Sequence, residues 1–284
     1  MSREDPLQPL EDNLICPEVG GWAEDKHRLV SLYSTLFSSG MKGKWDQRVY
    51  AELYSGAGYA RIRGTSKLIV GSPLRALLLK DAFDRYVFCE EMPEKLGALR
   101  IRAQRHATGA KVEYVEGDCN VRVDKILEAI PRGSKDNRVL TLCFADPFDI
   151  SLKFQTIREL ASARYMDFLI TLALGMDANR NYEHYIKNNA SKVDEFLGSS
   201  SWRQRWAAAQ WDAVRFTRFL ADEFSSSMAA LGYIPPPFYT MKEVRSHEKN
   251  LPLYRLALFS RHERAYKFWD QVAKYSTEQK GFWE

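Results

Sequence analysis

The feature that most constrains the fold of this chain is an apolar run that stops in a glycine-rich turn. The run RVYAELY (48–54) is followed by the turn SGAG (55–58). Three later apolar runs also reach a carboxylate: YVFCEE (86–91), VEYVEGDCN (112–120) and VLTLCFADPF (139–148). Parallel α/β sheets present nucleotide-like ligands where strands end in such turns. A GxG alone is weak evidence, but the series predicts a ligand site along the carboxyl edge of a parallel sheet.

Strand-like and helix-like segments alternate from residue 48 to residue 174, which is typical of a doubly wound parallel sheet. After three consecutive prolines (235–237), two strand-like runs should form an antiparallel hairpin at one end of this sheet. We therefore predict an α/β fold with a Rossmann-like, mostly parallel sheet, a C-terminal antiparallel hairpin and a helical insertion. The strands are expected at residues 48–54, 86–90, 111–115, 139–145, 166–174, 238–244 and 251–260.

The same pattern divides the chain into four segments. They are an N-terminal arm and helix (1–47), a Rossmann-like cofactor-binding core (48–174), an aromatic-rich helical insertion (175–235), and a terminal hairpin and helix that complete the core (236–284). We expect residues 1–18 to be loosely held. The insertion should cover the working edge of the sheet, or bury its aromatic side chains in a core of its own. The connection 59–71 is unusually long, which suggests a lid or a substrate loop.

The composition is that of an ordinary globular protein, with 45% hydrophobic and 27% charged residues. No apolar stretch is as long as a membrane helix and the N-terminus lacks a secretory pattern, so we predict a cytoplasmic protein without membrane contact. The net charge of +4 does not by itself indicate a nucleic-acid partner. The four cysteines form no CxxC pair and the five histidines show no metal-ligand spacing, which predicts reduced thiols and no metal.

Three common motifs do not fit the glycine turn. Ser55 lies in YSGAG rather than in the GxSxG of a nucleophile elbow. Arg61 stands where a dinucleotide fingerprint needs its third glycine, and the turn lacks the Gly-Lys-Ser/Thr ending of a phosphate-binding loop. These differences argue against a serine hydrolase, a dehydrogenase and an NTPase.

The order of these features resembles that of the class I S-adenosylmethionine-dependent methyltransferases. The shared pattern is a glycine-turn strand, an acid-ended second strand, GD after the third, DPF after the fourth, and a terminal strand pair. A closer resemblance, over most of the chain, is to the bacterial three-Cys-motif partner (TcmP) family. It rests on WAEDK (22–26), ELYSGAGYAR (52–61), GSPL (71–74), GDCN (117–120), ADPFDI (145–150) and LFSRHERAYKFWD (258–270).

Both resemblances imply a methyltransferase-like protein, and the second also implies a partner. TcmP proteins are named for a neighbouring protein with a radical-S-adenosylmethionine-like three-cysteine motif. Two hypotheses follow. In the first, the chain is an S-adenosylmethionine-dependent methyltransferase that modifies an amine in a nucleic acid. In the second, it is a non-catalytic Rossmann-fold accessory module for the three-cysteine protein.

The methyltransferase resemblance implies S-adenosylmethionine as the cofactor. Glu52 would accept a hydrogen bond from the methionine ammonium. Glu90 would bind the ribose hydroxyls, and strand register favours it over the adjacent Glu91, which points the other way. Asp118 would accept from the adenine amino group, with Cys119 supplying a backbone N–H. The alternatives are a solvated Glu52 at the sheet edge and an Asp118 that caps the following helix. The complete cofactor set is Glu52, Tyr54, Ser55, Gly56, Gly58, Glu90, Asp118 and Cys119.

Asp146, Pro147 and Phe148 are the predicted catalytic residues. In methyltransferases that act on base amines, a D/N/S-P-P-Y/F loop holds the amine while its aromatic ring stacks on the base. Asp146 could accept from such an amine and Phe148 could stack, but the second proline is missing and the aromatic comes one position early. The motif could also be a strand end with a helix N-cap nearby. Contacts to substrate phosphate or another acid are expected from Arg61, Arg63 and Arg180.

Overall fold

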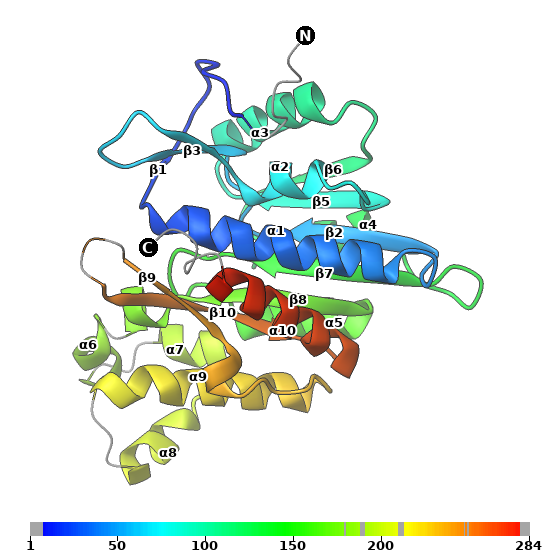
Figure 1. The fold of residues 1–284 in the computed structure, drawn as a ribbon. Helices are drawn as coiled ribbons and strands as arrows, with labels where there is room; N and C mark the ends of the chain where they lie inside the picture. Colours follow the sequence, from blue (N-terminus) through cyan, green and yellow to red (C-terminus); the bar gives the residue numbers. More distant parts are fainter. Residues whose placement is uncertain are drawn as a thin grey trace.

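The computed structural model describes residues 8–178, 180–187, 191–209, 213–246, 248 and 250–278. Within these residues the chain forms a seven-stranded sheet between two layers of helices (Figure 1). The strands lie in the order β6-β5-β2-β7-β8-β10-β9, and β10 runs antiparallel to both of its neighbours. Their bounds are β2 (Gln47–Glu52), β5 (Arg85–Glu90), β6 (Val112–Glu116), β7 (Val139–Ala145), β8 (Met166–Leu172), β9 (Lys242–Arg245) and β10 (Pro252–Phe259).

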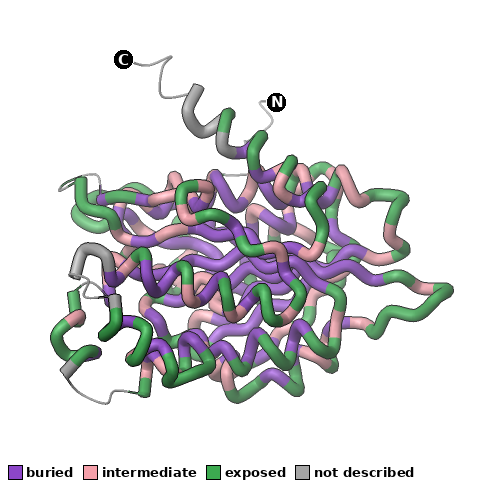
Figure 2. Tube along the Cα trace, turned by 90° about the horizontal axis from the view of Figure 1, so that it is seen from below, coloured by how far each residue is buried: buried purple, intermediate pink, exposed green. Residues whose placement is uncertain are grey.

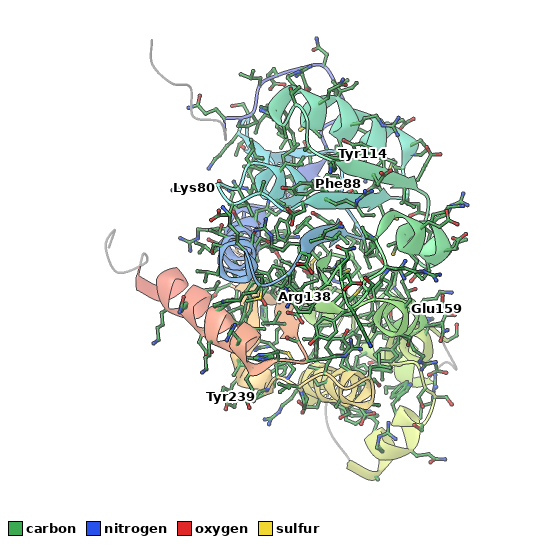
Figure 3. All side chains as sticks on the ribbon, turned by 90° about the vertical axis from the view of Figure 1, so that its right-hand side faces the viewer. Lys80, Phe88, Tyr114, Arg138, Glu159 and Tyr239 are labelled. Carbon is green, nitrogen blue, oxygen red and sulfur yellow. The ribbon has the colours of Figure 1, made fainter. Side chains whose placement is uncertain are left out.

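This strand order confirms the predicted fold class. The first strand of the sheet, β2, lies inside it, with β5 on one side and β7 on the other, both parallel to it. The chain therefore winds outward in both directions, as in Rossmann-like folds, and ligands bind at the carboxyl ends of the strands where the direction changes. Rings pack across neighbouring strands: the centroids of Phe88 on β5 and Tyr114 on β6 are 6.2 Å apart (Figure 3). The β9–β10 pair is the predicted C-terminal hairpin.

Successive residues of the central strands point to opposite faces, and helices cover both faces. On β7, Cys143 and Ala145 belong to one apolar core, whereas Leu142 and Phe144 belong to the other. A strand buried on both faces needs a continuous apolar run, which explains why VLTLCFA shows no polar alternation. Figure 2 shows that the buried residues are concentrated along these strands.

The helices on the two faces come from different parts of the chain. One core includes residues of α1 (Trp22–Met41), α2 (Ser72–Leu77), α3 (Pro93–His106) and α10 (Glu263–Glu278). The other includes residues of α4 (Val123–Ala129), α5 (Phe154–Ala163), α7 (Ser191–Leu197) and α9 (Ala213–Ala230). None of the described helices is long and apolar enough to cross a membrane.

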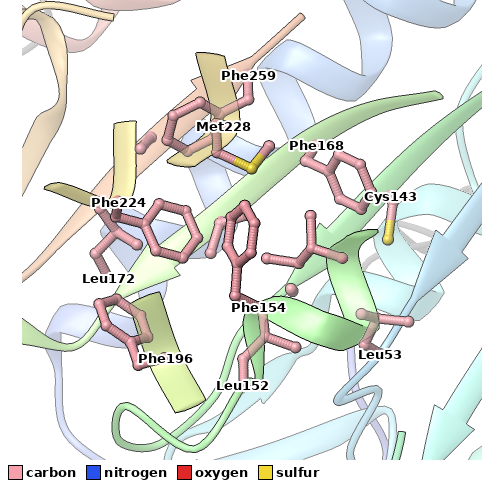
Figure 4. Close-up of a cluster of buried hydrophobic side chains, with 14 of the residues drawn as sticks. Leu53, Cys143, Leu152, Phe154, Phe168, Leu172, Phe196, Phe224, Met228 and Phe259 are labelled. Atoms are coloured by element: carbon pink, nitrogen blue, oxygen red, sulfur yellow. The ribbon is translucent and has the colours of Figure 1, made fainter. Parts of the chain in front are cut away.

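The described aromatic side chains of the insertion pack into the second of these cores. Trp202, Phe216 and Phe224 are fully buried, and Phe224 packs edge-on against Phe154 of α5 with ring centroids 5.8 Å apart (Figure 4). These side chains and residues of the sheet belong to the same apolar core, so the insertion is continuous with the main core. The remaining short helices are η1 (Leu174–Ala178), α6 (Tyr182–Lys187), α8 (Trp202–Ala209) and η2 (Phe238–Thr240). The four-segment division of the chain stays a prediction.

The connection 59–71, expected to be a lid or a substrate loop, has secondary structure of its own. It folds into a hairpin of β3 (Tyr59–Ile62) and β4 (Leu68–Val70), and β3 also pairs with β1 (Glu18–Val19). Ala60, Ile62 and Ile69 bury a small core against Ala23 of α1. These apolar residues flank a turn at Gly64, whose backbone φ is +74°, so a short hairpin is favoured over an irregular loop.

Residues 8–18, the part of the N-terminal arm that the structure describes, are also held more firmly than expected, whereas residues 1–7 lie outside the described residues. The guanidinium of Arg102, on α3, forms a buried ion pair with Asp12 at 2.8 Å. The same guanidinium donates to the carbonyl oxygens of Ile15, at 3.0 Å, and Ala57, at 2.6 Å. The arm is therefore joined through one side chain to the glycine turn. Nothing in the local sequence indicates this contact, because Asp12 and Arg102 are 90 positions apart.

Candidate functional site at the carboxyl edge of the sheet

The glycine turn leaves open space beside its backbone. Gly56 has φ +65°, and a Cβ placed there would meet no atom within 4 Å. Gly58 has φ +84° and is crowded, since a Cβ there would lie 3.0 Å from Leu74. The hydroxyl of Ser55 is buried and has no hydrogen-bond partner among the described residues. The turn therefore combines room at Gly56 with an unsatisfied donor and acceptor at Ser55.

Glu90 lies directly against this turn. One of its carboxylate oxygens accepts from the backbone N–H of Gly56 at 2.8 Å, and the other accepts from that of Met92 at 3.1 Å. Glu90 is 8% exposed, whereas the adjacent Glu91 is exposed. The choice of Glu90 over Glu91 from strand register thus agrees with the geometry. Its use by a ligand stays a prediction.

The environment of Glu52 differs from the two that the sequence suggested, a contact with the methionine ammonium and a solvated position at the sheet edge. It is almost fully buried, with one oxygen accepting from the hydroxyl of Ser72 at 2.6 Å and the other from that of Tyr50 at 2.9 Å. Burial raises the pKa of Glu52 to about 8, against the opposing effect of these two hydrogen bonds. Glu52 therefore has internal partners and is not solvated at the sheet edge.

The raised pKa of Glu52 should make the stability of the protein depend on pH. Because the pKa is about 8 in the folded chain and 4.5 as the ordinary value, the folded state holds this proton more tightly between those values. The contribution of Glu52 to the free energy of unfolding is fully present below pH 4.5 and is lost as the pH rises through about 8. Glu52→Gln cannot ionise, so its loss of unfolding free energy from about pH 5 to about pH 9 should be smaller than that of the wild type by roughly 2–4 kcal/mol.

Urea unfolding at the two pH values measures this difference. The matched control is Glu91→Gln, an exposed neighbour of the strand end, which should keep the wild-type dependence. Identical losses in the wild type and in Glu52→Gln would show that Glu52 is ionised at neutral pH in the folded protein.

Asp118, Cys119 and Tyr54 lie in the turn after β6 and beside it. Asp118 is half-buried, and its carboxylate accepts from the backbone and side-chain amides of Asn120 at 2.9 and 3.0 Å. It therefore stabilises its own turn rather than capping α4, which begins at Val123 without a side-chain cap. Burial raises the pKa of the Cys119 thiol to about 12 and also raises the pKa of the neighbouring Tyr54. Both groups are thus neutral at physiological pH.

Asp146 forms an ion pair that sequence reasoning missed. Its carboxylate contacts the ammonium of Lys26 on α1, and the two side chains are 16% and 12% exposed. The Lys26 ammonium also lies 5.2 Å from the centroid of the Tyr254 ring on β10. Lys26 and Asp146 are 120 positions apart. The sequence offered one indirect indication: the two residues lie in WAEDK and ADPFDI, which are both among the segments that resemble the TcmP family.

The ion pair borders a cavity of ≈ 200 Å³. Pro147 is buried next to it, whereas Phe148 is 82% exposed at its edge. Aromatic rings and one further cation complete the wall. The residues that line this cavity are Val19, Gly20, Trp22, Ala23, Lys26, Arg63, Asp146, Pro147, Phe148, Thr171, Met176 and Tyr254. It will be called the acceptor cavity.

Phe148 also borders a second, wider cavity of ≈ 530 Å³. Arg180 lines it, and so does Lys192, whose ammonium donates to Asp149 and Asp177 at 2.8 Å each. The predicted substrate arginines are therefore dispersed. Arg63 lines the acceptor cavity and Arg180 the wider one, while Arg61 is held by Glu11 at 2.8 Å. Phe148 stands between the two cavities.

No group of three or more His, Cys, Asp or Glu side chains within the described part of the chain is placed to hold a metal ion. The described cysteines, at positions 16, 89, 119 and 143, are free thiols.

The chain has distant structural neighbours among solved proteins. It is similar to cofactor-bound Rv0187 from MTB, at 12% identity over 88% of this chain and 84% of that one, with a TM-score of 0.49. It is similar to the O-methyltransferase from Bacillus cereus in complex with SAH, at 10% identity over 87% and 85%, TM-score 0.45. M. jannaschii TYW2 in complex with AdoMet gives 8% identity over 86% and 78%, TM-score 0.41. No protein-family profile and no curated protein matches the sequence.

Proposed function

We propose that this chain is an S-adenosylmethionine-dependent methyltransferase. The proposal rests on two features that occur at the same edge of the sheet. One is a glycine turn held by a carboxylate, and the other is an acid–cation pair beside a cavity. Glu90 contacts Gly56, and Asp146 with Lys26 borders the acceptor cavity. The first pair suits a nucleoside, and the second suits a group that loses a proton.

The residues present fit the cofactor at the glycine turn. The open space beside Gly56 admits close approach of a ligand, and the unpartnered hydroxyl of Ser55 is available to it. Glu90 would hold the ribose hydroxyls, and Asp118 the adenine amino group. Gly58, Cys119 and Tyr54 would shape the adjoining wall. Glu52 would act at most through Ser72 or water, because it is only 1% exposed and lies behind the hydroxyls of Tyr50 and Ser72 that donate to it.

Bound S-adenosylmethionine would supply an electrophilic methyl group on its sulfonium sulfur. Lys26 holds one carboxylate oxygen of Asp146 and thereby fixes the carboxylate. The other oxygen is then free to accept the N–H of an acceptor amine and to take its proton as the nitrogen is methylated. The walls of the acceptor cavity orient this amine, and positioning contributes the larger part of such a reaction.

We further propose that the acceptor is an amine of a base in a nucleic acid. Phe148 supports this substrate, because an aromatic ring left 82% exposed beside a cavity can stack on a base that has left its helix. Arg63 and Arg180 border the two cavities on either side of it and could bind flanking phosphates.

We also propose that the chain belongs to the TcmP family and acts beside a radical-S-adenosylmethionine-like three-cysteine protein. Contacts between segments that resemble this family support the proposal. Lys26 of WAEDK forms an ion pair with Asp146 of ADPFDI, and the hydroxyl of Ser72 in GSPL donates to Glu52 of ELYSGAGYAR. The expected result is co-elution of the two purified proteins on size exclusion, and separate elution at micromolar concentration would contradict it.

Transfer of label from methyl-labelled S-adenosylmethionine tests the proposed activity. The protein is incubated with fractionated cellular nucleic acid, protein and metabolites. We expect label in the nucleic-acid fraction, stable to protease and released by nuclease. Label in another fraction would overturn the nucleic-acid substrate. Cofactor binding without any transfer would instead support the accessory-module alternative.

Gly56→Ala should weaken cofactor binding more than it weakens the fold. An alanine in the left-handed backbone conformation of position 56 should lower the free energy of unfolding by about 1 kcal/mol. The new Cβ would also occupy the open space beside the turn. Gly64→Ala is the matched control, because Gly64 has φ +74° and equally open surroundings in the β3–β4 turn. Calorimetry should show a lower affinity for S-adenosylmethionine in Gly56→Ala only. An equal effect of both substitutions would contradict a ligand at Gly56.

A further inference from the structure

A chemically different cavity lies at the opposite, amino edge of the sheet. It has a volume of ≈ 190 Å³ and is bordered by the end of α1, the first half of α10 and the starts of β7 and β8. It shares no lining residue with the acceptor cavity or the wider cavity. Neither the proposed methyl transfer nor its cofactor uses it.

A buried carboxyl group lines this cavity. Asp167 is 6% exposed on β8, between the fully buried Met166 and Phe168. Burial raises the pKa of Asp167 to about 7, against the lowering effects of the neighbouring Ser260 hydroxyl and Arg261 guanidinium. The Arg261 guanidinium itself donates to the carbonyl oxygens of Ala161 and Leu231. A buried carboxylate without a full complement of donors is costly in a protein interior, so Asp167 can still accept from a ligand.

The walls around Asp167 are aromatic. Trp45 stacks on Tyr165 with ring centroids 5.3 Å apart and planes 27° from parallel. Phe268 of α10 reaches the cavity because it packs against Gly40 of α1, where a Cβ would lie 2.5 Å from its ring. Phe37 completes this side. Rings in this arrangement favour a planar, apolar ligand body.

The mouth of the cavity is basic. Lys44, His262 and Arg264 line it and are exposed. Lys44 also donates to the carbonyl oxygen of Gly40 at 2.8 Å, which holds it near the end of α1. Among the described lining residues, Asp167 is the only acid. A ligand would therefore meet an acceptor at the inner end and cations at the outer end.

We propose that this cavity binds a small aromatic ligand that donates an N–H to Asp167 at its inner end and presents a carboxylate or phosphate to Lys44 and Arg264 at its mouth. A small compound with these three features in line is 4-aminobenzoate. In 4-methylbenzoate a methyl group replaces the amine, so the pair of compounds isolates the contact with Asp167.

Titration of the full chain with the two compounds, followed by protein NMR, tests this assignment. We expect 4-aminobenzoate to bind at least tenfold more tightly than 4-methylbenzoate, with amide shifts centred on residues 165–168. Asp167→Val fits a strand and removes the acceptor, so it should abolish the difference between the compounds. Lys44→Ala with Arg264→Ala should weaken both. Thermal unfolding checks that each variant is folded.

Three results would overturn the proposal. They are no binding of 4-aminobenzoate at millimolar concentration, equal affinity of the two compounds in the wild type, and shifts centred on the acceptor cavity. The binding of S-adenosylmethionine should be unchanged in Asp167→Val, so the outcome here is independent of the proposed methyltransferase site.

Discussion

Replacing Asp146 with asparagine should lower the rate of methyl transfer by about 10²–10⁴-fold, the range for loss of a positioned general base. Asparagine keeps the shape of the side chain but cannot take the proton of an acceptor amine. It also leaves the ammonium of Lys26 without its carboxylate in a site where both side chains are largely buried. Some loss of stability is therefore expected together with the loss of rate.

Two further variants separate these effects. Lys26→Met combined with Asp146→Asn removes both charges, so the double variant should recover stability relative to either single variant without recovering activity. Asp46→Asn is the control, since Asp46 pairs with the exposed Arg138 and lines neither cavity. Its rate should stay within a few-fold of the wild type. Full activity in Asp146→Asn would remove Asp146 from the mechanism.

Arg102→Ala should lower the free energy of unfolding by about 3–5 kcal/mol, the cost of breaking a buried ion pair. Asp12 would be left buried without a cation, because the side chains of Arg102 and Asp12 are 1% and 5% exposed. The carbonyl oxygens of Ile15 and Ala57 would also lose their donor. Since Ala57 lies within the glycine turn, a weaker affinity for S-adenosylmethionine should accompany the loss of stability.

Urea unfolding measures the first effect and calorimetry the second. Arg105→Ala is the matched control, because Arg105 also approaches Asp12, at 3.4 Å, but is 44% exposed. Exposed ion pairs contribute little, so it should cost less than about 1 kcal/mol. Equal, small effects of the two substitutions would mean that the arm does not anchor the turn.

The sequence predicted most of the sheet because its strands leave a local signal. Runs such as VLTLCFA are apolar except for one threonine, as a strand buried on both faces requires. Register along 86–91 also favoured Glu90 over Glu91, and the backbone contact to Gly56 agrees with that choice. Both inferences needed only residues that lie close together in the chain.

What the sequence did not predict depends on contacts between distant residues. Lys26 meets Asp146 only because the start of α1 lies at the carboxyl edge, and Asp12 meets Arg102 only because the arm folds back onto α3. The partners of Glu52, Tyr50 and Ser72, could not be identified without the packing of β2 against α2. The β3–β4 hairpin was missed because its strands are only four and three residues long.

Calorimetric titration with S-adenosylmethionine tests the central claim most directly. The wild type should bind, and Glu90→Gln should bind at least about tenfold more weakly, because a hydrogen bond to a charged group contributes roughly 1.5–3 kcal/mol. Glu91→Gln should bind like the wild type, since Glu91 is exposed. Absence of binding by the wild type at millimolar cofactor, or equal affinity of wild type and Glu90→Gln, would contradict a cofactor site at the glycine turn.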